Sequence, residues 1–172
     1  MSSENRTSVP NSLNEHWMPF TSNKDFKANP RLITEAKGVY LKTHHGKTQI
    51  DASSGLFCNP LGHGRKEITE AVTKQLDTLD YAQPFQQGFG GSFELASKIA
   101  KHTPGDLNKM FFTICGSTAV ETAIKIAVAY HRAKGDAQRF RFVGRERGYH
   151  GMNIGCVSVG GMVNNVKTFA SI

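Results

Sequence analysis

The sequence predicts an α/β fold in which a mostly parallel sheet alternates with amphipathic helices. Short runs rich in β-branched and aromatic residues occur at Met110–Ile114, Phe140–Val143 and Ile154–Val159. Apolar residues at helical spacing lie before and between these runs, and 17 glycines divide the segments. Strands that alternate with helices in this way are typical of a parallel sheet with helices on its faces.

The composition is that of a globular domain. With 172 residues, 38% of them hydrophobic, the chain is long enough to bury a core. No stretch approaches the roughly 20 apolar residues of a membrane span. The polar N-terminus also lacks the apolar centre of a secretory signal. We therefore expect a cytoplasmic protein with no membrane partner.

The three cysteines, Cys58, Cys115 and Cys156, lie far apart and form no C-x-x-C pair. This spacing favours neither a zinc site nor a disulfide framework, so we predict no metal site. Each cysteine is expected to be a small buried apolar residue. The net charge of +7 comes from scattered basic residues, and the densest run, Arg139–Arg147, alternates like a strand. No nucleic-acid partner is therefore predicted.

In the first half of the chain, residues 1–15 form a polar arm, and Val39–Asp51 indicates two strands around a turn at His45-Gly46. Apolar residues at helical spacing predict a helix over Glu67–Leu79. A second amphipathic helix is expected after a glycine-rich stretch, with Ser92 as its N-cap.

In the second half, the predicted strand Met110–Ile114 ends at Cys115-Gly-Ser-Thr118, where a long helix is expected to begin. Thr118 and Glu121 have the spacing of a capping box, and Gly135 is a natural end for the helix. A helix start of this kind presents free amides and a positive dipole end to an anion. On spacing alone, phosphate binding and an ordinary capped helix remain alternatives.

Two further features are candidates for a binding site. The loop Gly144-Arg-Glu-Arg-Gly-Tyr-His-Gly151 follows a predicted strand, where open α/β sheets bind ligands. Its Tyr149 offers a flat face to a planar ring, although the loop could equally serve only to turn the chain. Aromatic and apolar residues in glycine- and proline-containing stretches either line a pocket or belong to the core. These are Trp17, Phe20, Leu56, Phe57 and Phe85.

Taken together, these segments resemble the class III aminotransferases, most closely the beta-alanine (omega-amino acid):pyruvate branch. The resemblance covers nearly all of residues 15–169 in order. It is carried by His16-Trp-Met-Pro-Phe-Thr21, Asn59-Pro-Leu-Gly-His63, Pro104-Gly-Asp-Leu107, Val120-Glu-Thr-Ala-Ile-Lys-Ile-Ala127 and Arg145-Glu-Arg-Gly-Tyr-His-Gly151, among other stretches.

The resemblance implies a fold type I, aspartate aminotransferase-like large-domain sheet, incomplete here, with an N-terminal hairpin segment. It implies pyridoxal 5'-phosphate as the cofactor, bound by Gly116, Ser117, Tyr149 and His150. Residues implied to bind substrate are Phe20, Leu56, Phe57 and Phe85, the last near a neighbouring subunit. The implied reaction moves an amino group from an omega-amino acid or amine, such as beta-alanine, to pyruvate in a homodimer or tetramer.

The same resemblance divides the chain into a polar arm (1–15), a small-domain segment (16–52) and the first part of the cofactor-binding domain (53–172). Cys115, Thr118 and Phe57 depart from the family's usual residues. No lysine here has the strand-end setting of the family's Schiff-base lysine. We therefore expect that lysine to be absent from this chain, leaving no catalytic residue and little activity alone. The alternative is a non-catalytic truncated subunit or gene fragment.

Overall fold

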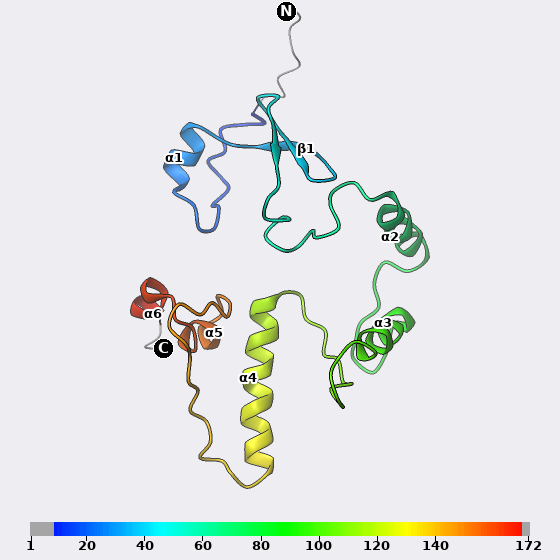
Figure 1. Ribbon diagram of the computed structural model, residues 1–172, viewed down its shortest axis with the longest axis vertical. Helices are drawn as coiled ribbons and strands as arrows, with labels where there is room; N and C mark the ends of the chain where they lie inside the picture. The colour runs from blue at the N-terminus through cyan, green and yellow to red at the C-terminus, as the bar shows by residue number, and fades with distance from the viewer. Residues whose placement is uncertain (1–8, 170–172) are drawn as a thin grey trace, which may run out of the picture. The chain divides into compact units, whose positions relative to one another are not determined.

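The computed structural model describes residues 9–169, which belong to two compact units, Met1–Gln87 and Gly88–Ile172 (Figure 1). The domain boundaries expected after residues 15 and 52 stay predictions.

The first unit contains a small antiparallel sheet. Its strands are β1 (Ile33–Lys37), β2 (Tyr40–Thr43) and β3 (Thr48–Ile50), in the order β1-β2-β3. The β2–β3 hairpin turns at Gly46, whose φ is +78°, so the predicted hairpin is confirmed. Strand β1 was not predicted; it pairs with β2 across a tight turn at Gly38.

Two helices flank this sheet in the chain. The short α1 (Asn23–Ala28) precedes the strands, and α2 (Lys66–Thr78) follows them and confirms the helix expected there. The apolar residues of α2 form one stripe, as expected, but the stripe is exposed: Ile68, Val72 and Leu76 are about half accessible to solvent.

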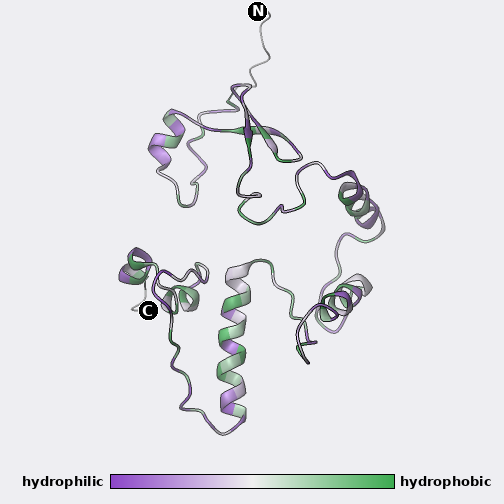
Figure 2. Cartoon of the chain, in the orientation of Figure 1, coloured by the Kyte–Doolittle hydropathy of each residue, from purple (hydrophilic) through white to green (hydrophobic). Residues whose placement is uncertain are grey.

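The second unit is helical. Its elements are α3 (Gly90–Ala100), α4 (Gly116–Ala133), α5 (Ile154–Ser158) and α6 (Val163–Phe169). Helix α5 packs against both α4 and α6. It contributes Cys156 and Val157, the buried hydrophobic residues of the described chain. Apolar and polar residues alternate along α4 (Figure 2), and Gly135 follows its last turn as predicted.

The three strands that the sequence predicts in the second unit do not form. Residues 110–114 and 140–143 belong to no ladder among the described residues, and Ile154–Ser158 is helix α5. Parallel strands are stable only when neighbouring strands pair with them and helices cover both faces. Here Ile114 and Val143 are 94% and 98% exposed, so neither segment has such cover.

Two helix starts also differ from the prediction. Helix α3 begins at Gly90, and the Ser92 hydroxyl donates to the Phe89 carbonyl inside the first turn (2.7 Å) instead of capping. Helix α4 begins at Gly116, two residues before the expected cap at Thr118, and Cys115 occupies the N-cap position. The side chain of Glu121 contacts Cys156 (3.6 Å), so the predicted capping box is wrong.

The cysteine prediction is correct for one residue in three. Cys156 is fully buried, but Cys58 and Cys115 are exposed. Both exposed thiols lie in or beside turns, where the chain has no second layer to cover them. A small apolar side chain is buried only where packing elements meet, as at α5.

Much apolar surface is accessible in both units. The accessible area is 14977 Å², against roughly 10,000 Å² for two separate compact proteins of half this mass. The excess does not depend on how the units are placed. Large apolar side chains exposed on α2, α3 and α4, such as Val72, Phe93 and Ile126, contribute to this area.

Candidate functional site

The start of α4 has backbone donors that lie outside the helical hydrogen-bond ladder. Cys115 is fully extended, with φ −163° and ψ 168°, and the chain turns into the helix at Gly116. The first helical bond joins the Ala119 amide to the Cys115 carbonyl (3.0 Å). The amides of Gly116, Ser117 and Thr118 therefore precede the helical ladder, at the positive end of an 18-residue helix. Such a start can bind an anion.

The Ser117 hydroxyl is fixed in place by the loop that approaches it. Its oxygen accepts the Met152 amide (3.0 Å), while the thiol of Cys156 lies 3.2 Å from the Ser117 carbonyl oxygen. Because the oxygen accepts one bond, the hydroxyl proton is still available for a second acceptor. The contacts bridge 35 and 39 residues of sequence, so they place two distant segments together.

Gly151 makes this close approach possible. Its φ is +117°, and a Cβ built there would lie 2.7 Å from both Cα and Oγ of Ser117. Real Cβ atoms do not approach other heavy atoms so closely, and the Ser117 backbone is held within α4. Only glycine therefore allows the loop to reach the helix start.

These segments enclose a pocket of about 350 Å³. It is lined by Cys115, Gly116, Ser117, Val120, Tyr149, His150 and Gly151. The structure therefore brings together all four residues that the sequence assigned to a cofactor. Cys115, one of the departures from the family's usual residues, also lines the pocket. The sequence reasoning gave no role to Val120 or Gly151, although Gly151 ends the loop motif and Val120 lies one helical turn after Ser117.

The wall of this pocket includes a thiol whose pKa is lowered. The Thr118 hydroxyl contacts the Cys115 sulfur at 3.3 Å and is the main cause, and the first-turn amides of Thr118 and Ser117 add to it. The same donors that favour a bound anion thus favour the thiolate. By contrast, burial and the neighbouring Glu121 carboxylate raise the pKa of Cys156.

The residues expected to bind substrate all lie in the first unit. Leu56 and Phe57 are adjacent in a turn with left-handed backbone, and both are strongly exposed. Phe20 lines a separate hollow of about 320 Å³ with Asp25 and Arg31. Phe85 is 78% exposed in the segment after α2. The structure brings only Leu56 and Phe57 together.

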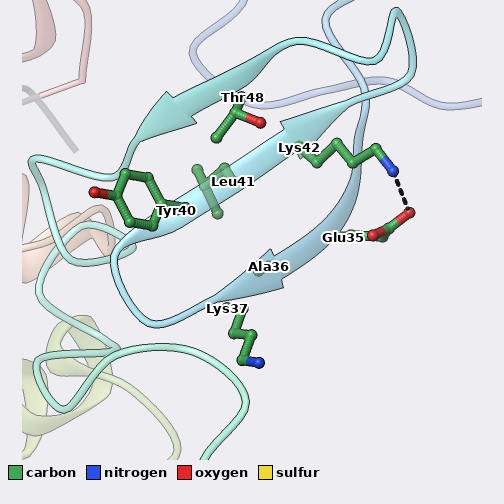
Figure 3. Close-up of a pocket in the computed structure, with 7 residues that line it drawn as sticks. All are labelled: Glu35, Ala36, Lys37, Tyr40, Leu41, Lys42 and Thr48. Atoms are coloured by element: carbon green, nitrogen blue, oxygen red, sulfur yellow. Dashed lines mark hydrogen bonds and ion pairs between the residues drawn. The ribbon is translucent and has the colours of Figure 1, made fainter.

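A larger hollow, about 460 Å³, lies on the sheet of the first unit (Figure 3). It contains none of the predicted site residues. Its Lys42 is paired with Glu35 at 2.9 Å, and both side chains are about half exposed or more. Because the two exposed charges are paired with each other, they offer a ligand little electrostatic attraction, so we assign no site there.

Comparison with known proteins decides the family. Residues 21–171 match the family model described as aminotransferase class-III. The chain belongs to the class-III aminotransferases. The resemblance found in the sequence is therefore confirmed over most of the chain.

Curated relatives within this family are similar along nearly the whole chain. The omega-aminotransferase of Caulobacter vibrioides is 46% identical over 162 residues, which are 94% of this chain and 37% of that protein. The beta-alanine–pyruvate aminotransferase of Pseudomonas aeruginosa is 48% identical over 160 residues, 93% of this chain and 36% of that protein. The chain thus spans slightly more than a third of the length of these relatives.

Solved class-III structures share the fold. The omega transaminase from Pseudomonas jessenii in complex with PMP matches with a TM-score of 0.88 at 29% identity, over 95% of this chain and 37% of that one. An (S)-enantioselective omega-transaminase from Thermomicrobium roseum matches with 0.84 at 31% identity, over 90% and 34%. The predicted fold class, a partial fold type I α/β transferase, is confirmed.

Pyridoxal phosphate is the cofactor of class-III aminotransferases, as the sequence led us to expect. Within residues 9–169, no three His, Cys, Asp or Glu side chains gather where a metal ion could be held. No helix in the described part of the chain combines the length and apolar character that crossing a membrane requires.

Proposed function

We propose that this chain forms the phosphate- and ring-binding part of an enzyme that transfers an amino group from an omega-amino acid or amine to pyruvate. The observation that carries the proposal is the pocket in which the α4 start, the Ser117 hydroxyl and the Tyr149 ring converge. Relatives named as beta-alanine–pyruvate and omega-amino acid–pyruvate aminotransferases, 48% and 50% identical, support this substrate class.

The pocket has the chemistry that a phosphorylated planar cofactor requires. The amides at Gly116 and Ser117 and the free hydroxyl proton of Ser117 would hold the phosphate. Tyr149, 57% exposed, would stack on the ring, with His150 beside it. When bound, pyridoxal phosphate supplies an electron sink for the carbon that carries the amino group.

Other residues of the chain would position the cofactor contacts and provide apolar contacts to the substrate. Gly151 keeps the loop against α4, so that the ring and phosphate contacts are held at a fixed spacing. Leu56, Phe57, Phe20 and Phe85 would provide apolar contacts that favour the carbon chain of the amino donor. None of the lysines is assigned a covalent role, and the transfer itself is a proposal for the protein that contains this chain.

A second subunit is part of the proposal. The aromatic residues Tyr81 and Phe85 are 71% and 78% exposed, and apolar faces remain uncovered on α2 and α4. A homodimer, or a tetramer, would cover such surface. Light scattering at several concentrations measures the mass, and a monomer at all of them would contradict this part.

Equilibrium dialysis and an amino-transfer assay test the function. Pyridoxal phosphate should bind the chain, whereas pyridoxal, which lacks the phosphate, should bind much more weakly. The full protein should then form alanine from pyruvate with beta-alanine as donor. Equal binding of pyridoxal phosphate and pyridoxal would contradict the phosphate site. Cofactor binding without alanine formation would indicate a non-catalytic subunit.

A further inference from the structure

The loop after β3 contains four consecutive residues with left-handed backbone. The φ angles of Ser54, Gly55, Leu56 and Phe57 are +52°, +59°, +55° and +69°. The turn closes through hydrogen bonds from the Phe57 amide to the Ser53 carbonyl (2.9 Å) and from the Asn59 amide to the Ser54 carbonyl (2.8 Å). L-residues other than glycine avoid this conformation, so three of the four positions need support from elsewhere.

Packing does not supply that support within the first unit. The side chains of Leu56 and Phe57 are 73% and 84% exposed. The turn therefore projects two large apolar side chains without burying either. In natural proteins, strained backbone that presents exposed side chains occurs mainly at functional sites.

A carboxylate that is largely shielded from solvent holds the turn instead. Asp51 Oδ2 accepts the Gly55 amide at 2.8 Å, and Oδ1 accepts the amide and hydroxyl of Ser53 at 3.3 and 3.1 Å. The Asp51 side chain is only 8% exposed. These bonds, with the bond from His63 first among them, lower the pKa of Asp51 to about 2.

His63 closes the loop from its other end. Its Nε2 lies 2.9 Å from Asp51 Oδ2, and its Nδ1 lies 2.7 Å from Asn59 Nδ2. In the neutral ring, Nε2–H donates to the carboxylate and Nδ1 accepts the Asn59 amide proton. Because Asn59 also closes the turn through its backbone, His63 connects both ends of the loop.

Both partners are anchored to the same point of the sheet. The Asp51 amide donates to the Val39 carbonyl (2.8 Å), and His63 exchanges two backbone hydrogen bonds with Gly38 (2.8 and 2.9 Å). The Asp51–His63 pair therefore connects the turn at Gly38, between β1 and β2, to the projecting loop.

We propose that the Asp51–His63 pair is a positioning device that clamps the turn Ser54–Phe57 and so fixes where Leu56 and Phe57 meet the amino donor. The inference rests on the proposed function, in which those two side chains bind substrate. Neither Asp51 nor His63 needs to touch the substrate, so both act through the turn. Loss of the clamp should change donor recognition and leave cofactor binding, which uses residues of the second unit, unaltered.

Hydrogen exchange tests the clamp without any assay of activity. In Asp51→Asn, the amides of Gly55, Phe57 and Asn59 should exchange faster than in the unaltered chain. Glu35→Gln, which breaks an exposed ion pair on the same sheet, should leave them unchanged. Unaltered exchange in Asp51→Asn would overturn the clamp.

Steady-state kinetics of the full protein tests the consequence for substrate. Asp51→Asn should raise KM for beta-alanine and bulkier amines by about tenfold, because misplaced contacts lose binding and orientation. The dissociation constant of pyridoxal phosphate should stay the same. An unchanged KM would contradict the inference. A rise in KM matched by an equal loss of cofactor affinity would also contradict it.

A glycine rescue separates positioning from general damage. Ser54→Gly removes strain at φ +52°, so adding it to Asp51→Asn should reverse part of the rise in KM. Ala52→Gly, which lies outside the left-handed run, should leave the raised KM unchanged. Equal effects of the two glycines would overturn the role of the turn. Faster exchange in Asp51→Asn together with no amino transfer by the unaltered protein would contradict only the proposed function.

Discussion

The turn Ser54–Phe57 and the pocket at the α4 start are built in opposite ways. The turn is held by side-chain hydrogen bonds within residues 51–63, and its apolar side chains are exposed. The pocket is held by contacts that bridge 35 and 39 residues, beside the buried Cys156 and Val157. The turn is therefore a local, polar structure, whereas the pocket depends on contact between segments that are distant in the sequence.

The difference separates two tasks. A local polar loop can change its projecting side chains without disturbing a core, which suits the choice of substrate. A pocket assembled from distant segments loses its shape if either segment moves, which suits a constant cofactor. Substitutions in the two regions should therefore affect different measured quantities.

The largest effect is expected for Gly151→Ala. The new Cβ would press on Ser117, and forced overpacking costs about 1–3 kcal/mol, so cofactor affinity should fall by about fivefold to 150-fold. Amide exchange at Gly55 and Asn59 should not change. Gly135→Ala is the matched control, since its φ is +88° but its Cβ would meet nothing within 4 Å. Equal losses in both variants would attribute the effect to backbone strain alone.

Ser117→Ala should weaken pyridoxal phosphate binding by about tenfold or more, because a hydrogen bond to a charged group contributes about 1.5–3 kcal/mol. Binding of pyridoxal, without the phosphate, should change much less. Calorimetric titration measures both. Ser158→Ala removes a hydroxyl that donates to the Ile154 carbonyl within α5, so it should have no effect on either. An unaffected Ser117→Ala would reduce the α4 start to an ordinary helix terminus.

Tyr149→Ala should weaken the cofactor less, because ring stacking contributes about 0.5–1.5 kcal/mol beyond the area buried. Tyr149→Phe keeps the ring and should retain the affinity. The same titration of both variants identifies the ring as the contact. If Tyr149→Phe loses as much as Tyr149→Ala, the hydroxyl is the important group and the stacking role is wrong.

The smallest effect concerns pH. Because the pKa of Cys115 is lowered from its ordinary value of 9.0, a thiolate forms in the pocket wall at lower pH than an ordinary cysteine would require. A thiolate repels a bound phosphate, so cofactor affinity should fall as pH rises through that pKa. Cys115→Ser should remove this dependence. Cofactor affinity is measured between pH 7 and 9 for the unaltered protein and for Cys115→Ser. An equal fall in both would exclude the thiol as the cause.

The sequence predicted the composition of the pocket better than its construction. Gly116, Ser117, Tyr149 and His150 line one pocket, as the resemblance led us to expect. Gly116 and the loop glycines Gly148 and Gly151 mark the places where the chain turns beside them. The start of α4 was misplaced, since cysteine is not among the usual N-caps and Thr118 is. Apolar alternation in Ile154–Val159 suggested a strand, but contact with Ser117 and α4 favours a helix.

The clamp on the first unit was beyond sequence reasoning for a different reason. Asp51 and His63 lie 12 positions apart in the sequence, with glycine and proline between them, and polar pairs at that distance have no periodicity. The left-handed backbone at Leu56 and Phe57 also contradicts the preferences of those residue types, so local propensity predicts the wrong conformation. Strain of this kind is visible only once the hydrogen bonds that offset it are known.

The contrast between the two thiols of the second unit makes the pocket accessible to chemical labelling. Cys156 is fully buried and its pKa is raised, whereas Cys115 is exposed at the pocket wall and its pKa is lowered. An alkylating reagent should therefore modify Cys115 and spare Cys156. Once Cys58, the other exposed thiol, is replaced by serine, a single fluorophore can be attached beside Ser117. The protein thus carries its own attachment point for a probe that reports when the pocket fills.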